Sequence, residues 1–335
     1  MSNNNLKSLL FEYQQKRDRA LNDCLKRKYE LYEKYPDIED IDKNIASLSI
    51  QAIQTSLITS TNNTDKNKKE IEELKLEKQD LLKKYRISNK FFLPKFECSK
   101  CEDTGYIKTA SGNVLCSCIK QKLYNLAYNN SNIFDLENQN FDNFRLDLYS
   151  DKVDVEKYSL DISPRENITS IKETCQDFIN NFDSSSQNNL LFSGHTGLGK
   201  TFLSTCIANE LIKKGKNVLY QTAPIMLDKI IDYKFGKSND NIVDSIYSVD
   251  LLIIDDLGTE TKNNLKVTEL FNIINTRLLN QNNKITKTII STNLSLQELY
   301  DTYDERIVSR ILGYYNACYF YGEDIRREMK RLVTS

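Results

Sequence analysis

The sequence has almost no net charge and no long apolar run. In its 335 residues, 46 Lys and Arg offset 47 Asp and Glu, so the formal net charge is −1. This balance excludes the global basic field of a dedicated sequence-independent DNA binder, so any contact with nucleic acid must be local. No apolar run approaches the ~20 residues that a membrane span needs, and the first residues do not form a secretory signal. We therefore expect a cytoplasmic protein, long enough for two domains, that has no membrane partner.

Glycine is scarce as well, with ten residues in the whole chain. Residues 6–85 contain no glycine and a single proline, Pro36. Apolar residues keep helical spacing in two stretches, namely Ile41, Ile45, Leu48, Ala52 and Ile53, and then Ile71, Leu74, Leu81 and Tyr85. Because a polar turn at 59–65 separates the stretches, the pattern predicts an antiparallel helical hairpin or small bundle. Such a region is either a self-packed domain or a docking surface for another protein, and the sequence favours neither.

Three of the ten glycines lie in one octapeptide at 194–201. It reads Gly194, His195, Thr196, Gly197, Leu198, Gly199, Lys200 and Thr201. An apolar run precedes it and a helix-like stretch follows, which is the context of a phosphate-binding loop. Backbone N–H groups of such a loop turn towards the β-phosphate, Lys200 neutralises the β/γ oxygens, and the Thr201 hydroxyl ligates Mg²⁺. The loop therefore predicts binding of a nucleoside triphosphate with magnesium.

The rest of the C-terminal half alternates apolar strands with helices. After a predicted helix at 166–182 and a first strand at 189–192, the strand candidates are 217–220, 251–254, 288–291 and 318–321. This alternation predicts an α/β fold in which helices cover both faces of a parallel sheet.

Polar residues follow two of these strands directly. Asp255 and Asp256 end one strand, and Asn293 ends another. Because parallel strands present ligand-binding groups at their carboxyl ends, we expect these side chains beside the phosphate loop. Asp255 is the candidate for Mg²⁺, Asp256 for polarising the attacking water, and Asn293 for orienting that water. The alternatives are an acidic turn after a core strand and, for Asn293, an ordinary turn residue.

Two arginine clusters follow, at 305–310 and 322–327. The fork of an arginine suits phosphate oxygens, and a finger supplied to a neighbouring subunit can raise turnover by about 10³ to 10⁵. Surface salt bridges are the alternative for both clusters.

Four of the eight cysteines crowd into one short segment as Cys98-x-x-Cys101 and Cys116-x-Cys118. The first pair precedes a glycine turn, and a hairpin-sized excursion separates it from the second. The pattern predicts a structural zinc site with four sulfur ligands, although the second pair is tighter than the usual spacing. Reduced structural cysteines are the alternative. The other four cysteines, which are scattered, are expected to be buried thiols.

Taken together, these residues resemble the AAA+ ATPases, and more narrowly the bacterial replicative helicase loaders of the DnaC/DnaI type. The resemblance covers about 90–335, and its specific part is the combination of the cysteine knuckle with the ATPase motifs. In the family's pattern, 194–201 is Walker A, Asp255 and Asp256 are Walker B, and Asn293 is sensor 1. Arg310 matches the arginine finger and Arg326 the sensor 2 arginine. The expected domains are a helical partner-binding region at 1–90, a zinc module at 91–125, a linker with a lead-in helix at 126–187, and the AAA+ domain at 188–335.

The resemblance implies an ATP-dependent loader that delivers the replicative DNA helicase onto single-stranded DNA and forms a nucleotide-dependent homo-oligomer. Many AAA+ proteins carry Asp-Glu where this chain has Asp255-Asp256, which implies slow hydrolysis; Glu260 is a weaker candidate for compensation. Loaders of this type carry an extra helix facing DNA where this chain has 223–237. The candidate contacts there are Lys229, Tyr233, Lys234, Phe235 and Lys237, and an amphipathic core helix is the alternative reading. Two other functions stay open: a helper ATPase of DNA transposition of the IstB type, and a helicase-binding adaptor with negligible ATP hydrolysis.

Overall fold

The chain divides into two compact units, which are described separately. The computed structural model describes residues 3–58, 63–110, 112–126, 138–186, 188–238, 242–261, 263–280 and 285–327. Residues 10–114 form one unit, called here the helical unit, and residues 1–9 with 115–335 form the other, called the α/β unit. Parts of three predicted segments, the polar turn at 59–65, the linker at 126–187 and the end of the domain at 188–335, lie outside the described residues. Within the described residues, no helix is both long enough and apolar enough to cross a membrane.

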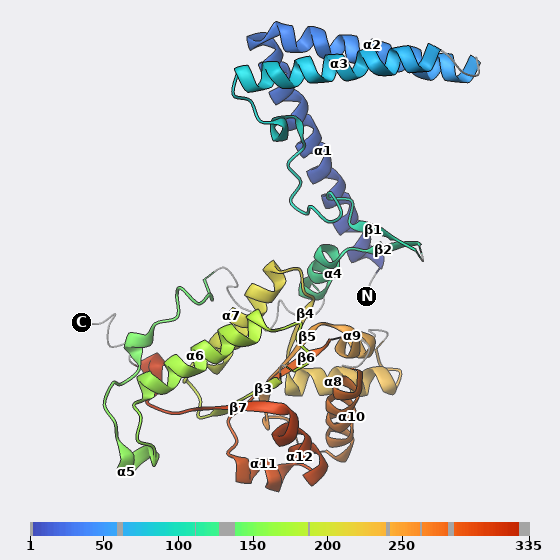
Figure 1. The fold of residues 1–335 in the computed structure, drawn as a ribbon. Coiled ribbons are helices and arrows are strands. Elements are labelled where there is room, and N and C mark those ends of the chain that lie inside the picture. The colour runs from blue at the N-terminus through green and yellow to red at the C-terminus, as the bar shows by residue number, and fades with distance from the viewer. Residues whose placement is uncertain are drawn as a thin grey trace. The chain divides into compact units, whose positions relative to one another are not determined.

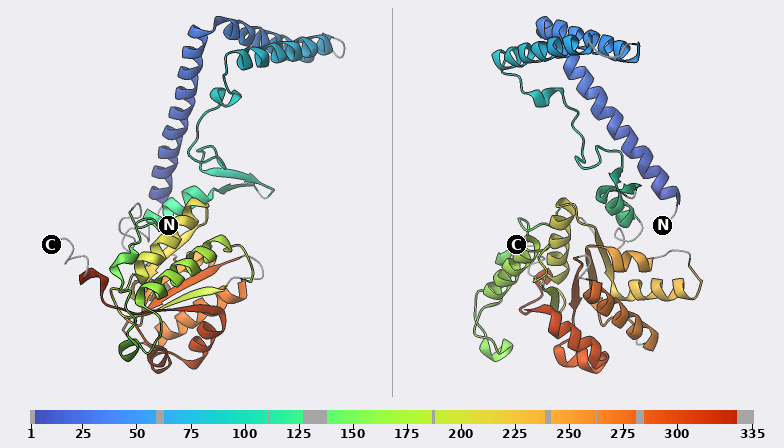
Figure 2. Two further views of the ribbon diagram at one scale, coloured as in Figure 1. Left: turned by 60° about the vertical axis from the view of Figure 1, so that its left-hand side comes forward. Right: turned by 45° about the vertical axis from the view of Figure 1, so that its right-hand side comes forward.

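The helical unit contains the predicted hairpin. Helix α1 (Asn3–Lys34) is followed by α2 (Pro36–Ile58) and α3 (Asn63–Lys84), and α2 and α3 lie side by side (Figures 1 and 2). Leu31, Tyr32, Ile38 and Leu82 form a buried cluster where the three helices meet. A salt bridge from Lys78 to Asp42 at 2.6 Å links α3 to α2. Ile53, which the helical spacing grouped with the apolar stripe, is 62% exposed.

Short elements follow the hairpin. They are the 3₁₀ helix η1 (Asn89–Phe92), strands β1 (Tyr106–Thr109) and β2 (Gly112–Leu115) of a two-stranded sheet, α4 (Ser117–Tyr124), the 3₁₀ helix η3 (Leu146–Leu148) and α5 (Val155–Tyr158).

A five-stranded parallel sheet is the centre of the α/β unit, as the alternating pattern predicts. Its strands are β3 (Asn189–Gly194), β4 (Val218–Thr222), β5 (Leu251–Leu257), β6 (Lys287–Thr292) and β7 (Tyr315–Phe320). They lie in the order β4-β5-β6-β3-β7, and every neighbouring pair is parallel. The last strand begins three residues earlier than the predicted 318, because it follows its preceding helix with no loop between them.

Successive residues of each strand face opposite sides of the sheet, so each face has its own core. Leu190 and Phe192 pack on the side of α6 (Pro164–Asn180) and α7 (Lys200–Lys213). Leu191 packs on the other side, which is covered by α8 (Ala223–Lys234), α9 (Ile242–Ser248), α10 (Asn264–Asn280), α11 (Leu296–Thr302) and α12 (Glu305–Tyr314). Figure 1 shows the two layers of helices. The predicted helix at 166–182 runs from 164 to 180 instead, because Ser163 and Glu166 form a capping box at its start.

A glutamine side chain covers the edge of this sheet at β4. Gln121, on α4, is buried; its amide nitrogen donates to the Val218 carbonyl at 3.0 Å, and its amide oxygen accepts from the Val218 N–H at 2.7 Å. One side-chain amide thus satisfies both backbone groups of an edge residue. Asn217 Nδ2 also donates to the Ser117 carbonyl at 2.9 Å, so α4 is fixed to the sheet at two points.

Arg277, near the end of α10, is 1% exposed and joins three segments. Its guanidinium donates to the Ile246 carbonyl at 2.6 Å, the Lys287 carbonyl at 2.7 Å and the Thr288 hydroxyl at 2.9 Å. A further bond reaches the Val249 carbonyl at 3.2 Å. Burial lowers the pKa of Arg277 to about 10, so the group stays charged at neutral pH.

Arg277→Met should lower the free energy of unfolding of the α/β unit by about 3 kcal/mol or more. The methionine fills a similar space but leaves buried carbonyls without a donor, each of which costs about 1–3 kcal/mol. Urea unfolding curves measure the loss. Arg145→Met is the control, because Arg145 is half exposed and pairs with Asp147 at the surface, where such a pair contributes about 1 kcal/mol or less. Equal stability of the two variants would contradict the role assigned to Arg277.

Candidate functional site

The octapeptide 194–201 forms a tight loop between β3 and the first turn of α7. Gly194, Gly197 and Gly199 have φ angles of +142°, +76° and +90°. A Cβ atom on Gly194 would lie 2.1 Å from the Phe320 carbonyl oxygen, and one on Gly197 would lie 2.0 Å from a carboxylate oxygen of Asp324. All three positions therefore favour glycine for their conformation, and Gly194 also requires it for space because the obstacle is backbone.

Lys200 is buried inside this loop. Its ammonium group donates to the Gly194 carbonyl at 2.6 Å, the His195 carbonyl at 2.7 Å and Asn293 Oδ1 at 2.8 Å. Burial lowers the pKa of Lys200 to about 8, although the carboxylates of Asp255 and Asp256 act against the shift. The structure thus brings the predicted lysine and the predicted asparagine into direct contact.

Asp255 lies two residues before the end of β5 and is 3% exposed. The Thr201 hydroxyl donates to its Oδ2 at 3.1 Å, so the loop and the predicted acid meet. Mg²⁺ prefers oxygen ligands of this kind, and the hydroxyl–carboxylate pair fits a magnesium ion bound with a nucleotide.

Asp256 follows in a β-bulge. Ile254 pairs with Ile290 and Leu257 with Thr292, so two residues of β5 face the single residue Ser291 of β6. Asp256 has a φ angle of +54°, in the left-handed region that aspartate tolerates better than most residues. Burial, and then the Asp255 carboxylate, raise the pKa of Asp256, whereas Lys200 and Arg326 act to lower it.

Lys200, Thr201, Asp256 and Asn293 lie around a pocket of about 300 Å³. It is lined by Gln139, Thr196, Gly197, Leu198, Gly199, Lys200, Thr201, Phe202, Asp256, Asn293, Ile325 and Arg326. Nine of these twelve were candidates from the sequence, including Leu198 and Arg326, whereas Gly194 and His195 contact Lys200 through their carbonyls.

Other residues at the loop were missed by sequence reasoning. The Tyr149 hydroxyl donates to the Leu198 carbonyl at 2.9 Å, and the Ile325 N–H donates to the Gly197 carbonyl at 3.0 Å. The aromatic residues of the linker, including Phe144 and Tyr149, were the available signal, because both pack against the loop and α7.

Arg310 and Glu260 lie apart from this pocket. Arg310, on α12, donates to Asn275 Oδ1 at 2.9 Å, and its guanidinium stacks on Phe271 at 4.7 Å from the ring centroid. Glu260 accepts a hydrogen bond from the Gly258 N–H at 2.9 Å and another from the Tyr303 hydroxyl. Neither side chain lines the pocket of its own chain.

The candidate DNA contacts lie on α8 and just after it. Lys234 forms an ion pair with Glu269 at 2.7 Å, Lys229 and Tyr233 are half-buried, and Lys237 is exposed. Phe235 is 64% exposed.

The four clustered cysteines come together as the spacing predicts. The ligand atoms of Cys98, Cys101, Cys116 and Cys118 lie within 4.8 Å of one another. Four sulfurs around zinc, with bonds of about 2.3 Å, would lie about 3.8 Å apart, so the donor set fits zinc. Asp103 fixes the turn that carries Cys98 and Cys101, called here the first knuckle. Its carboxylate accepts hydrogen bonds from the Glu97 N–H at 2.9 Å and the Cys98 N–H at 2.8 Å.

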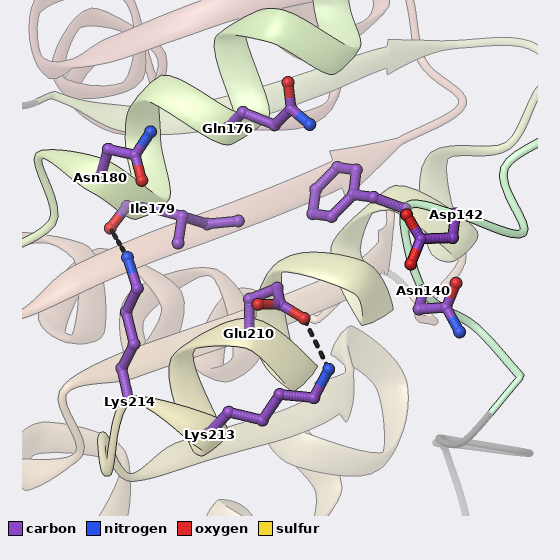
Figure 3. Close-up of a pocket in the computed structure, with 9 residues that line it drawn as sticks. Asn140, Asp142, Gln176, Ile179, Asn180, Glu210, Lys213 and Lys214 are labelled. Carbon is purple, nitrogen blue, oxygen red and sulfur yellow. Dashed lines mark hydrogen bonds and ion pairs between the residues drawn. The ribbon is translucent and has the colours of Figure 1, made fainter.

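A second pocket, of about 580 Å³, lies between α6, α7 and the segment at 140–142 (Figure 3). Its cations already have partners, since Lys213 donates to Glu210 at 2.7 Å and Lys214 to the Ile179 carbonyl at 3.2 Å. None of its lining residues lines the first pocket.

The glycine loop after β3, the buried lysine and the acids of β5, which is separated from β3 by β6, define a P-loop nucleotide-binding domain. The family model described as IstB-like ATP binding protein matches residues 144–316, and the chain belongs to this family.

Parts of this chain are also similar to known relatives and to solved structures. The replicative helicase loader DnaC of Escherichia coli (strain K12) is 29% identical over 123 residues, which are 36% of this chain and 49% of the relative. This chain therefore spans about half the length of the curated relatives it matches. A crystal structure of the DnaC helicase loader aligns at 22% identity and a TM-score of 0.42, over 56% of this chain and all of that one. A crystal structure of DnaI aligns at 22% identity and a TM-score of 0.40, over 55% of this chain and 94% of that one.

We predict one zinc ion per chain, measured by elemental analysis of the purified protein. Cys101→Ser should remove most of the metal, because a hydroxyl is a much weaker zinc ligand than a thiolate. Cys24→Ser is the matched control, since Cys24 is also buried but donates to the Phe92 carbonyl outside the cluster. Equal zinc content in the two variants would contradict the assignment.

Proposed function

We propose that this protein is an ATP-dependent loader that delivers the replicative DNA helicase onto single-stranded DNA during replication initiation or restart. The observation that carries the proposal is the hydrogen bond from Lys200 to Asn293, next to the hydrogen bond from Thr201 to Asp255. It is made in a chain whose relatives include a helicase loader. A nucleotide held there would control when the protein holds or releases its helicase.

The residues of the phosphate loop and of the strand ends beside it have separate roles in this proposal. Backbone N–H groups of 194–199 and the ammonium of Lys200 hold the triphosphate, and Thr201 with Asp255 holds Mg²⁺, which supplies charge neutralisation at the phosphates. Asp256 polarises the attacking water and Asn293 orients it. With aspartate in place of glutamate, hydrolysis to ADP and phosphate is slow. Slow hydrolysis suits a protein in which the bound nucleotide switches between holding and releasing the helicase.

The two arginines act on different copies of the chain. Arg326 lines the pocket of its own chain and contacts the phosphates as the sensor arginine. Arg310 serves as the finger for the nucleotide of a neighbouring subunit, which makes the homo-oligomer dependent on ATP. Its stacking on Phe271 and its bond to Asn275 orient the guanidinium on α12.

The remaining regions bind the partners. The helical region at 1–90 holds the helicase, the zinc module at 91–125 is structural, and the linker at 126–187 leads into the AAA+ domain at 188–335. Exposed Phe235 stacks on bases of single-stranded DNA and Lys237 contacts its backbone. Lys229, Tyr233 and Lys234 support that contact from α8. The site of action is the cytoplasm.

A pull-down with the full chain as bait from the host's soluble extract, with ATP present, tests the function. Capture of the replicative helicase is the expected result. Capture of a transposase instead would favour the role of helper ATPase in transposition. ATP turnover with and without single-stranded DNA tests the adaptor alternative, because an adaptor would show no stimulation by DNA.

Arg310→Ala should reduce ATP hydrolysis by about 10³-fold while leaving ATP affinity unchanged. The reason is that a finger stabilises charge in the transition state and does not hold the ground-state nucleotide. Arg306→Ala is the matched control: Arg306 lies one turn away and also stacks on Phe271, at 5.1 Å, but pairs with Asp304. Steady-state hydrolysis and equilibrium nucleotide binding are measured on each variant. A parallel loss of affinity and turnover in Arg310→Ala would remove Arg310 from this role.

A further inference from the structure

The Asp255 carboxylate is held by more than the residues of the phosphate loop. Its Oδ2 accepts from Thr201 and from the hydroxyl of Tyr220, which is completely buried on the neighbouring strand β4. Its Oδ1 accepts from the hydroxyl of Ser291 on β6 and from the N–H of Asp256 at 3.1 Å. Donors from both flanking strands therefore fix the carboxylate between them.

Ser291 also acts on the second acid. Its Oγ accepts a hydrogen bond from the Asp256 N–H at 3.1 Å while it donates to Asp255. Ser291 is the residue of β6 that faces the two-residue bulge of β5. It therefore lies opposite Asp256, whose backbone has the left-handed conformation. A single hydroxyl thus contacts both the carboxylate of Asp255 and the backbone of Asp256.

We propose that Tyr220 and Ser291 are positioning residues that hold Asp255 in the orientation required for magnesium bound with nucleotide. Carboxylates that ligate metals are themselves oriented by hydrogen bonds, and loss of such a partner typically costs about 10- to 100-fold in metal affinity. Neither residue lines the pocket, so neither touches the nucleotide and both act through Asp255. This inference rests on the proposed nucleotide site and adds the residues that prepare its metal ligand.

The test is a titration of Mg²⁺ into the full chain with a fluorescent ATP analogue, comparing wild type, Tyr220→Phe and Ser291→Ala. Each substitution removes one oxygen atom. We expect the Mg²⁺ concentration at half-maximal binding to rise about tenfold or more in each variant, while binding of the analogue in EDTA stays at the wild-type level. A merely structural role would lower the melting temperature without moving the Mg²⁺ midpoint.

Tyr303→Phe is the matched control, because Tyr303 is a buried tyrosine whose hydroxyl also donates to a carboxylate, that of Glu260. Its Mg²⁺ midpoint should equal that of wild type.

An unchanged midpoint in Tyr220→Phe and Ser291→Ala would overturn the inference while leaving the nucleotide site intact. If one of them does not fold, the other decides the question by itself. No binding of the analogue by wild type at any Mg²⁺ concentration would overturn the nucleotide site and this inference with it.

Discussion

The α/β unit depends on burying two opposite charges where the carboxyl ends of its strands meet. Lys200 and Asp255 are 6% and 3% exposed, and an ion so deep in a protein is tolerated only when hydrogen bonds replace its water. The acceptors for Lys200 come from the end of β3 and from Asn293 after β6, whereas the donors to Asp255 come from α7, β4 and β6. These partners meet only if β4, β5, β6 and β3 keep their pairing register. The order of the strands and the burial of the two charges therefore depend on each other.

Much of this arrangement could be predicted from the sequence because its signals are local. The loop at 194–201 is contiguous, and Asp255, Asp256 and Asn293 follow apolar runs directly, so rules about strand ends bring them together. Tyr220 and Ser291 gave no such signal. Their contact with Asp255 depends on which strands are neighbours and on a bulge in β5, and neither can be read from one strand alone. Asp324 and Tyr149 were missed for the same reason, since each reaches the loop from a distant segment.

The helical unit and the cysteines show what spacing can and cannot predict. Periodicity was sufficient for the hairpin of α2 and α3. Ile53 is nevertheless exposed next to the half-buried Ala52, because spacing alone does not fix how wide the buried face of a helix is. The pairs at 98–101 and 116–118 converge as their spacing predicts. Asp103, which shapes the first knuckle through two backbone N–H groups, lies only two residues after Cys101, where sequence reasoning had assigned just a turn.

The amide of Gln121 on Val218 has a consequence for how copies of this chain can associate. A bare outer strand is a template on which a foreign strand can add, and such growth leads to open-ended aggregates. At β4, the Gln121 side chain hydrogen-bonds both main-chain groups of Val218 and so blocks that template at the first residue of the outer strand. Addition of a foreign strand is thereby disfavoured at the start of β4.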